Sequence, residues 1–196
     1  AWPELLPAGL RWPAVGATVL LSPLLHLLLQ RVAPAGTTHP APAHGMQELT
    51  FNPYAKKGDQ DYGLLYIGIG DGGSAENGFD FISDHKGNAV WSSILRIDPK
   101  GKNSQNGKYG IPKNNPFVGQ NDKAPEVFAY GFRNPNRIFW DPRGRMMASE
   151  IGHKHIEEIN LIEPGKFYGW PRREGTFVIN PNGDMDKVYA LPSDDD

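Results

Sequence analysis

A short unit recurs along the chain and constrains its fold more than any other feature. An apolar run enters Asn-Pro or Asp-Pro, passes through a polar turn and leads to another apolar run. Proline presets the first central position of a turn, and a following glycine accepts a positive φ, so each unit predicts a hairpin. The prolines are Pro53, Pro99, Pro142 and Pro181, separated by 46, 43 and 39 residues.

This spacing is typical of β-propellers, whose blades repeat every ~40–50 residues. We predict an all-β fold with strands at residues 49–51, 64–69, 94–97 and 138–140, in successive antiparallel sheets arranged radially. No segment from His44 onward keeps the apolar period of a helix over three turns. An all-β sandwich with ordinary turns has the same local pattern and stays open as the alternative.

Composition favours a turn-rich folded chain over a disordered one. The 23 glycines and 18 prolines supply turns, while five Trp, seven Tyr and nine Phe supply the burial that disordered chains lack. The net charge of -2 gives no indication of a nucleic-acid or anionic-membrane partner. Cysteine is absent, which excludes disulfides, thiolate zinc sites and a cysteine nucleophile.

The first 42 residues differ from the rest in composition and lack the strand-and-turn pattern. Residues 16–30 are apolar but short for a membrane span, and they have the length of the apolar core of a signal peptide. Glu4 weakens that interpretation, and a core helix or unrelated upstream sequence is the alternative. A Pro/Ala/Thr-rich linker at residues 32–42 then marks a boundary. We predict an N-terminal segment, 1–42, that packs little against a domain at 43–196, and a secreted or periplasmic protein.

Six motifs follow one another in the domain, and each alone is weakly specific. They are GDGG (70–73), LRIDPKG (95–101), IPKNNPF (111–117), AYGFRNP (129–135), EEINLI (157–162) and YGWP (168–171). Their ordered combination resembles the soluble quinoprotein glucose and aldose dehydrogenases, a family that includes sorbosone dehydrogenase-like proteins. The resemblance runs from about His44 to Gly175. It implies a six-bladed propeller, of which this chain would form an incomplete arc of about three to four blades.

The resemblance implies that the complete protein oxidises an aldose with calcium-bound pyrroloquinoline quinone. His44 matches the base that takes the proton of the anomeric hydroxyl, and Arg133 matches the arginine beside the reactive quinone carbonyl. Asn134 matches a neighbouring cofactor contact. Histidine titrates near neutrality, as a general base should, and a guanidinium stabilises negative charge that develops on oxygen. As plain alternatives, His44 would be a solvated loop residue, and Arg133 would cap the turn set by Pro135.

Calcium ligands are also implied by the resemblance. Gly152 and His153 match positions whose backbone carbonyls bind the calcium that holds the quinone. The loop ligands or their supports match Glu157, Glu158 and Tyr168. Calcium accepts carbonyl and carboxylate oxygens without strict geometry, which suits a loop of this composition.

Plainer interpretations compete at these positions too. A neighbouring pair of glutamates such as Glu157 and Glu158 is commonly just solvated. His153 and His155 would share one face of a strand and suggest zinc, although no third ligand is evident. Asp71 is expected to close the Gly-rich turn rather than to take part in chemistry.

Departures from the family pattern bear on function. Ala43 replaces a polar residue often seen before the base, and Gly72 stands where glucose-specific members carry glutamine, which favours the broader aldose branch.

Beside an aldose, the implied partners are an external electron acceptor and, for the complete protein, a second copy in a homodimer. Two alternatives remain: a non-catalytic binding propeller similar to the dehydrogenase-like domain of hedgehog-interacting proteins, and a propeller lactonase.

Overall fold

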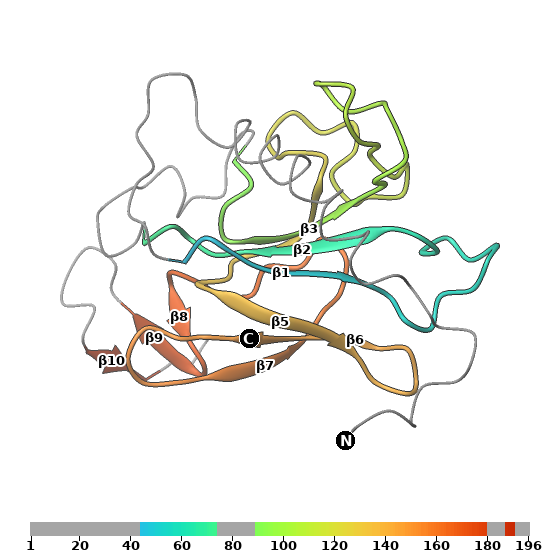
Figure 1. The fold of residues 1–196 in the computed structure, drawn as a ribbon. Helices are drawn as coiled ribbons and strands as arrows, with labels where there is room; N and C mark the ends of the chain where they lie inside the picture. The colour runs from blue at the N-terminus through green and yellow to red at the C-terminus, as the bar shows by residue number, and fades with distance from the viewer. Residues whose placement is uncertain (1–43, 74–88, 180–186, 191–196) are drawn as a thin grey trace.

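The structure is a computed structural model, and it describes residues 44–73, 89–179 and 187–190. In these ranges the chain forms ten strands in three antiparallel sheets (Figure 1). The predicted all-β class is therefore confirmed. The predictions for residues 1–42 fall outside the described residues. No helix in the described part is long and apolar enough to span a membrane.

The first sheet has four strands in chain order: β1 (Met46–Phe51), β2 (Leu65–Ile69), β3 (Ser93–Ile97) and β4 (Val127–Tyr130). The second has three, also in chain order: β5 (Pro135–Trp140), β6 (Met146–Glu150) and β7 (Glu158–Leu161). The third is small and ordered β10-β9-β8, from β8 (Arg173–Glu174), β9 (Phe177–Ile179) and β10 (Val188–Tyr189).

The four predicted strand segments are all strands, but their distribution among sheets was predicted wrongly. Residues 49–51, 65–69 and 94–97 lie in β1, β2 and β3 of one sheet, with Leu64 just before β2, and only 138–140 lies in the next sheet. The reason is that the Asx-Pro turns in the described residues join neighbouring strands of one sheet and do not mark the passage to the next sheet. One such turn follows β1 and another follows β3 of the same sheet.

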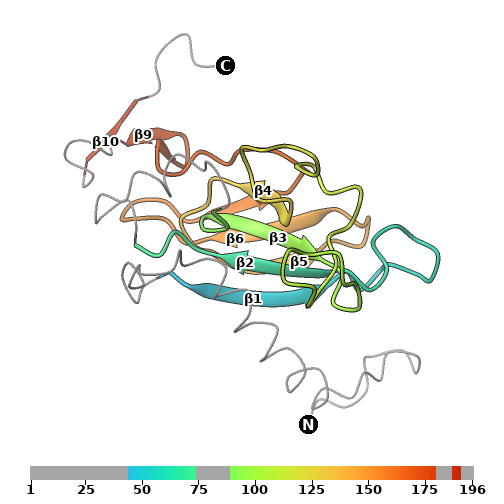
Figure 2. The same cartoon turned by 90° about the horizontal axis from the view of Figure 1, so that it is seen from above.

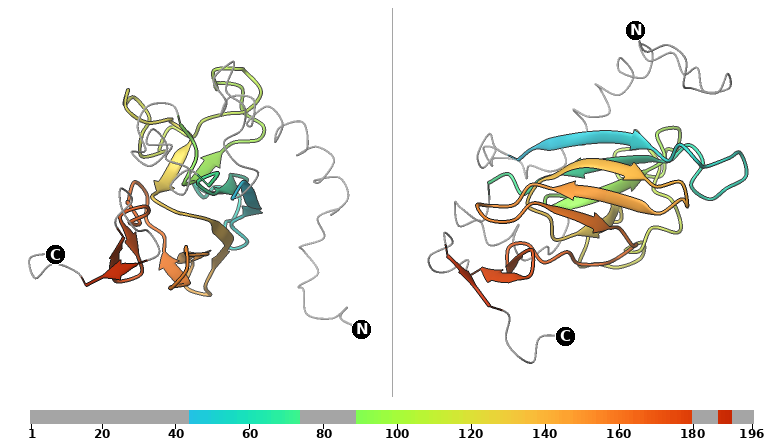
Figure 3. Two further views of the ribbon diagram at one scale, coloured as in Figure 1. Left: turned by 90° about the vertical axis from the view of Figure 1, so that its left-hand side faces the viewer. Right: turned by 90° about the horizontal axis from the view of Figure 1, so that it is seen from below.

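The first and second sheets stack face to face (Figures 1 and 2). β1 and β2 both contact β5, and one core cluster draws Tyr66 and Ile94 from the first sheet and Ile138 and Ala148 from the second. The opposite face of the first sheet carries a second cluster, which the long loop after β3 covers with Tyr109 among others. The third sheet lies to one side of this pair (Figure 3). Stacked antiparallel sheets of this kind are typical of neighbouring propeller blades.

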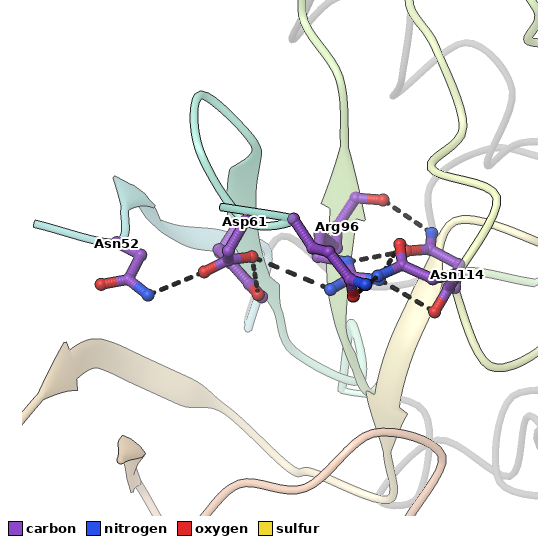
Figure 4. Close-up of polar contacts among 7 residues, drawn as sticks. Asn52, Asp61, Arg96 and Asn114 are labelled. Atoms are coloured by element: carbon purple, nitrogen blue, oxygen red, sulfur yellow. Dashed lines mark hydrogen bonds and ion pairs between the residues drawn. The ribbon is translucent and has the colours of Figure 1, made fainter. Parts of the chain in front are cut away.

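Arg96 is buried in the first sheet, and two of the six sequence motifs meet around it. It comes from LRIDPKG on β3, and its Nε donates to Asn115 Oδ1 at 2.8 Å (Figure 4). Its Nη2 donates to the carbonyl of Asn114 at 3.0 Å and to that residue's Oδ1 at 2.8 Å. Both asparagines belong to IPKNNPF in the β3–β4 loop. These motifs are therefore structural, because a buried guanidinium needs several acceptors.

On the other side of Arg96 lies Asp61, from the loop between β1 and β2. Asp61 accepts hydrogen bonds from Asn52 Nδ2 at 2.8 Å and from the Tyr66 hydroxyl at 2.6 Å, and its Oδ1 lies 3.8 Å from Arg96 Nη1 (Figure 4). Burial and this carboxylate raise the pKa of Tyr66. The network links two loops of the first sheet through one buried cation.

Replacement of Gly68 by alanine should test the stacking of the sheets. A Cβ on Gly68 would lie 2.6 Å from the backbone oxygen of Pro135 in β5, so the sheets would have to separate. We expect Gly68→Ala to lower the free energy of unfolding by about 1–3 kcal/mol, measured by urea denaturation. Gly45→Ala is the matched control, since no atom lies within 4 Å of its added Cβ. Equal midpoints for the two variants would contradict this stacking.

Candidate functional site

Asp71 is the centre of a hydrogen-bond cluster at the end of β2. Its carboxylate is fully buried, and its Oδ1 accepts from the backbone N–H of Gly73 at 2.9 Å, as a turn-closing aspartate should. The same oxygen lies 2.7 Å from His44 Nδ1, and Oδ2 accepts from Trp170 Nε1 at 2.9 Å. Because a carboxylate only accepts, Nδ1 of His44 carries the hydrogen, and Nε2 of the neutral ring is left as an acceptor.

The backbones of His44 and Arg133 both approach Gly70 closely. A Cβ on Gly70 would collide with the carbonyl of His44 and would lie 2.9 Å from that of Arg133. The next two amides continue the contact, since Asp71 N donates to Arg133 O at 2.8 Å and Gly72 N donates to His44 O at 3.2 Å. His44 itself has a φ of +52°. A non-glycine residue in that region is uncommon and is often found at functional sites.

The guanidinium of Arg133 points toward the loop that follows β6. Its Nη1 donates to Gly152 O at 2.7 Å, and its central carbon lies 5.6 Å from the centroid of the Trp170 ring. Trp170 thus contacts Arg133 on its ring face and Asp71 through its N–H. The structure therefore connects His44, Asp71, Trp170, Arg133 and Gly152 in one continuous series of contacts.

A recess of about 10 Å³, enough for one water molecule, lies beside Arg133. Arg133, Gly152 and Trp170 line it together with the carboxylates of Glu150, Glu158 and Glu174. His44 does not line this recess and reaches it only through Asp71 and Trp170. Of the predicted residues, Arg133 and Gly152 are in direct contact, and His44 is in indirect contact with both.

Glu150 ends β6 and holds the turn that carries Asn134. Its Oε1 accepts the Asn134 N–H at 2.7 Å, whereas its Oε2 and the Asn134 Oδ1 are buried with no hydrogen bond among the described residues. Burial, with a smaller contribution from the charges of Glu158 and Asp71, outweighs the backbone N–H donors of Asn134 and Arg133 and raises the pKa of Glu150 to about 8. A protonated carboxyl therefore lies behind Arg133 at neutral pH.

The side chains predicted as calcium ligands are not gathered into one cluster. Glu157 is exposed, and Glu158, at the recess, accepts from Asn160 Nδ2 at 3.1 Å. The Tyr168 hydroxyl donates to Leu161 O at 2.7 Å and accepts from the backbone N–H of residue 163 at 2.8 Å. In the described ranges, no three His, Cys, Asp or Glu side chains are close enough to hold a metal.

The zinc alternative rested on a wrong local structure. The sequence pattern places His153 and His155 on one face of a strand, but both lie in the loop between β6 and β7. The His153 ring instead packs at a tilt 6.2 Å from the Trp170 ring. Alternation along a strand therefore does not apply to this pair.

Sequence reasoning missed three residues of this site. Asp71 was assigned only its turn, although an aspartate in a Gly-rich turn after a buried strand can accept from several segments at once. Trp170 was noted only as part of the YGWP motif. Glu150 ends a strand with alternating burial, and that alternation would have placed its side chain inside.

Comparison with known proteins agrees with this organisation. The profile of the Glucose / Sorbosone dehydrogenase family matches residues 39–185. The HIPL2 protein of Arabidopsis thaliana is 35% identical over 129 residues, which cover 61% of this chain and 18% of that protein. Quinoprotein glucose dehydrogenase B of Acinetobacter calcoaceticus is 40% identical over 65 residues, covering 33% and 13%. The chain thus spans less than a fifth of either curated relative.

A solved structure supports the fold. The crystal structure of an oxidoreductase (glucose dehydrogenase) from Thermus thermophilus matches with a TM-score of 0.50 and 30% identity, covering 79% of this chain and 40% of that one. With its stacked antiparallel sheets, the chain forms an incomplete β-propeller, as the sequence predicted.

The raised pKa of Glu150 predicts a pH-dependent stability. Between its ordinary pKa of 4.5 and about 8, the native state keeps a proton that the unfolded state releases. The free energy of unfolding should therefore fall as pH rises through this window, by up to ~1.4 kcal/mol per pH unit. Glu150→Gln mimics the protonated carboxyl and should remove this slope.

The measurement is urea denaturation of the metal-free protein at several pH values across this window. Glu163→Gln, at an exposed glutamate, is the control and should keep the wild-type slope. A Glu150→Gln variant with the slope of the wild type would show that Glu150 ionises normally.

Proposed function

The chain belongs to the glucose/sorbosone dehydrogenase family, and we propose that the protein it forms part of oxidises an aldose at the anomeric carbon to the lactone. The proposed cofactors are pyrroloquinoline quinone and Ca²⁺. One observation carries the proposal: the continuous contacts that link His44, a base, to Arg133, a permanent cation, through Asp71 and Trp170. The name of the Acinetobacter relative supports a quinone cofactor.

The residues beside Arg133 fit a hard cation. The carbonyl of Gly152 already faces a positive charge, and the buried Asn134 Oδ1 has no hydrogen bond among the described residues. Calcium prefers oxygen ligands and tolerates irregular geometry. We assign the carbonyls of Gly152 and His153 as the calcium-holding atoms.

The three predicted loop residues would act around these carbonyls. Glu158 lines the recess and would add negative charge, Glu157 lies exposed on the same loop, and Tyr168 fixes the turn after β7. The Gly152 carbonyl that would face the calcium accepts from Arg133 Nη1 at 2.7 Å in this structure. The guanidinium beside it would be close enough to hold an anionic group of the cofactor.

The cofactor pair has a defined chemical contribution. When bound, the quinone would accept the hydride, and the calcium would polarise its carbonyl. Arg133 and Asn134 would hold it, because a planar guanidinium over the Trp170 ring suits a flat anionic molecule.

His44 would take the proton of the anomeric hydroxyl through Nε2. Asp71 fixes the ring by its 2.7 Å bond to Nδ1 and stabilises the imidazolium that proton transfer creates. Asp71 is itself fixed by Trp170 and Gly73. Hydride leaves the anomeric carbon as the proton goes to His44, so the sugar loses two electrons and two hydrogens. Arg133 would meanwhile stabilise the negative charge that develops on oxygen.

A non-catalytic binding propeller is the second candidate, and it keeps the scaffold without the reaction. An intact set of His44, Asp71 and Arg133 favours the enzyme. The electron acceptor, a homodimer and a secreted or periplasmic location remain predictions from the sequence.

Replacement of His44 should separate proton transfer from binding. In the complete protein reconstituted with Ca²⁺ and quinone, we expect His44→Gln to lower aldose-dependent dye reduction by ~10²–10⁴-fold. Quinone binding, followed by absorbance titration, should stay within a few-fold. His155→Gln, an exposed histidine, is the matched control. Wild-type protein that binds quinone stoichiometrically but reduces no dye with any aldose would favour the non-catalytic propeller.

Replacement of Arg133 should be costly even when the charge is kept. Lysine lacks the planar fork that lies over the Trp170 ring, so Arg133→Lys should reduce kcat by ~10-fold or more. Arg137→Lys, with an exposed guanidinium on β5, is the control. Wild-type kcat in Arg133→Lys would mean that only net charge matters there.

A further inference from the structure

Glu174 on β8 reaches across to the loop between β6 and β7. Its side chain is buried, and its Oε1 accepts the backbone N–H groups of Lys154 at 2.9 Å, His155 at 2.9 Å and Ile156 at 3.2 Å. Three consecutive amides converging on one oxygen form an anion-binding nest. A strand of the third sheet therefore holds a loop of the second sheet by its backbone.

The packing around this carboxylate is tight. A Cβ on Gly152 would lie 2.5 Å from Glu174 Oε1 and would collide with the carbonyl of Ile156. The next residue of the hairpin also presses on the loop, since a Cβ on Gly175 would lie 2.7 Å from Ile156 Cγ2. The loop from 152 to 156 is therefore wrapped closely around the Glu174 carboxylate.

This arrangement separates the donors and the acceptor of the loop. The N–H groups of residues 154–156 face Glu174, while the carbonyl of Gly152 faces Arg133 at 2.7 Å. Burial alone would raise the pKa of Glu174, but its backbone donors outweigh burial and leave the pKa below its ordinary value. The carboxylate is thus charged at neutral pH, and its Oε1 accepts the hydrogen bonds of the loop amides.

We infer that Glu174 is the positioning residue that turns the Gly152 carbonyl toward the cofactor side of the site. The inference rests on the proposed function for what that carbonyl binds, but the hold on the loop can be measured without any ligand. Glu174 acts through the backbone of the loop, since it accepts hydrogen bonds from the amides of residues 154–156. Its role is therefore geometric rather than catalytic.

The first experiment measures amide hydrogen exchange at residues 154–156 in the complete protein, free of metal and quinone. We expect Glu174→Ala to speed exchange there by ~10-fold or more, because each tenfold corresponds to ~1.4 kcal/mol of lost protection. Glu174→Gln keeps an acceptor oxygen and should stay within ~3-fold of wild type. Glu163→Gln, an exposed glutamate, is the control. Wild-type exchange in Glu174→Ala would overturn the hold on the loop.

The second experiment titrates the same proteins with quinone at fixed Ca²⁺ and follows absorbance. We expect the affinity to fall ~10-fold in Glu174→Ala and to be largely restored in Glu174→Gln. Faster exchange with unchanged quinone affinity would overturn the positioning role. A wild-type protein that binds no quinone would contradict the proposed function instead. The hydrogen-exchange result would still decide whether Glu174 holds the loop. If the alanine variant fails to fold, the glutamine variant and a Glu174→Asp variant, whose shorter side chain cannot reach, take its place.

Discussion

The carboxylate of Asp71 is the constraint on which the site depends. A fully buried carboxylate costs several kcal/mol unless donors surround it, and here the donors come from three separate segments of chain. His44 precedes β1, Gly73 follows β2, and Trp170 lies between the second and third sheets. Because His44 and Trp170 are far from Asp71 in the sequence, the carboxylate has all of these donors only in the folded arrangement.

Backbone hydrogen bonds extend this constraint to the other strand ends. Ser92 N donates to Gly70 O at 3.0 Å, and Ser92 O accepts from Gly131 at 2.9 Å and Phe132 at 3.2 Å. Ser92 has a φ of +55°, one of two positive values among the described non-glycine residues, and His44 has the other. Both strained residues therefore lie in the same layer of loops. Strain there is sustained only because the surrounding bonds fix the backbone.

The sequence predicted local structure and chemistry better than it predicted connections in space. Alternation and Asx-Pro turns located the strands, but the turns after β1, β3 and β5 all lie inside a sheet, so they do not show where one sheet ends and the next begins. Arg133 and Gly152, both selected from the motif resemblance, lie in direct contact in the structure, while their roles stay predictions. Nothing local marks Glu174, because its partners lie on a different sheet and are backbone amides, which have no residue signature. Asp71 was predicted in part. The Gly-rich motif predicts its turn, but no local pattern predicts its bond to Trp170, because that bond joins distant parts of the chain.

The motifs of this chain divide into two kinds, and only one kind bears on catalysis. LRIDPKG and IPKNNPF contribute buried Arg96 and the asparagines that accept its hydrogen bonds, and this contact is structural in this chain. GDGG and AYGFRNP meet at Gly70, where the backbones of His44 and Arg133 approach one another. A relative that lost activity would be free to change His44 or Arg133 while it kept Arg96 and its asparagines. The proposed dehydrogenase function therefore rests on the contacts of Asp71 with His44 and Trp170 rather than on the overall family match.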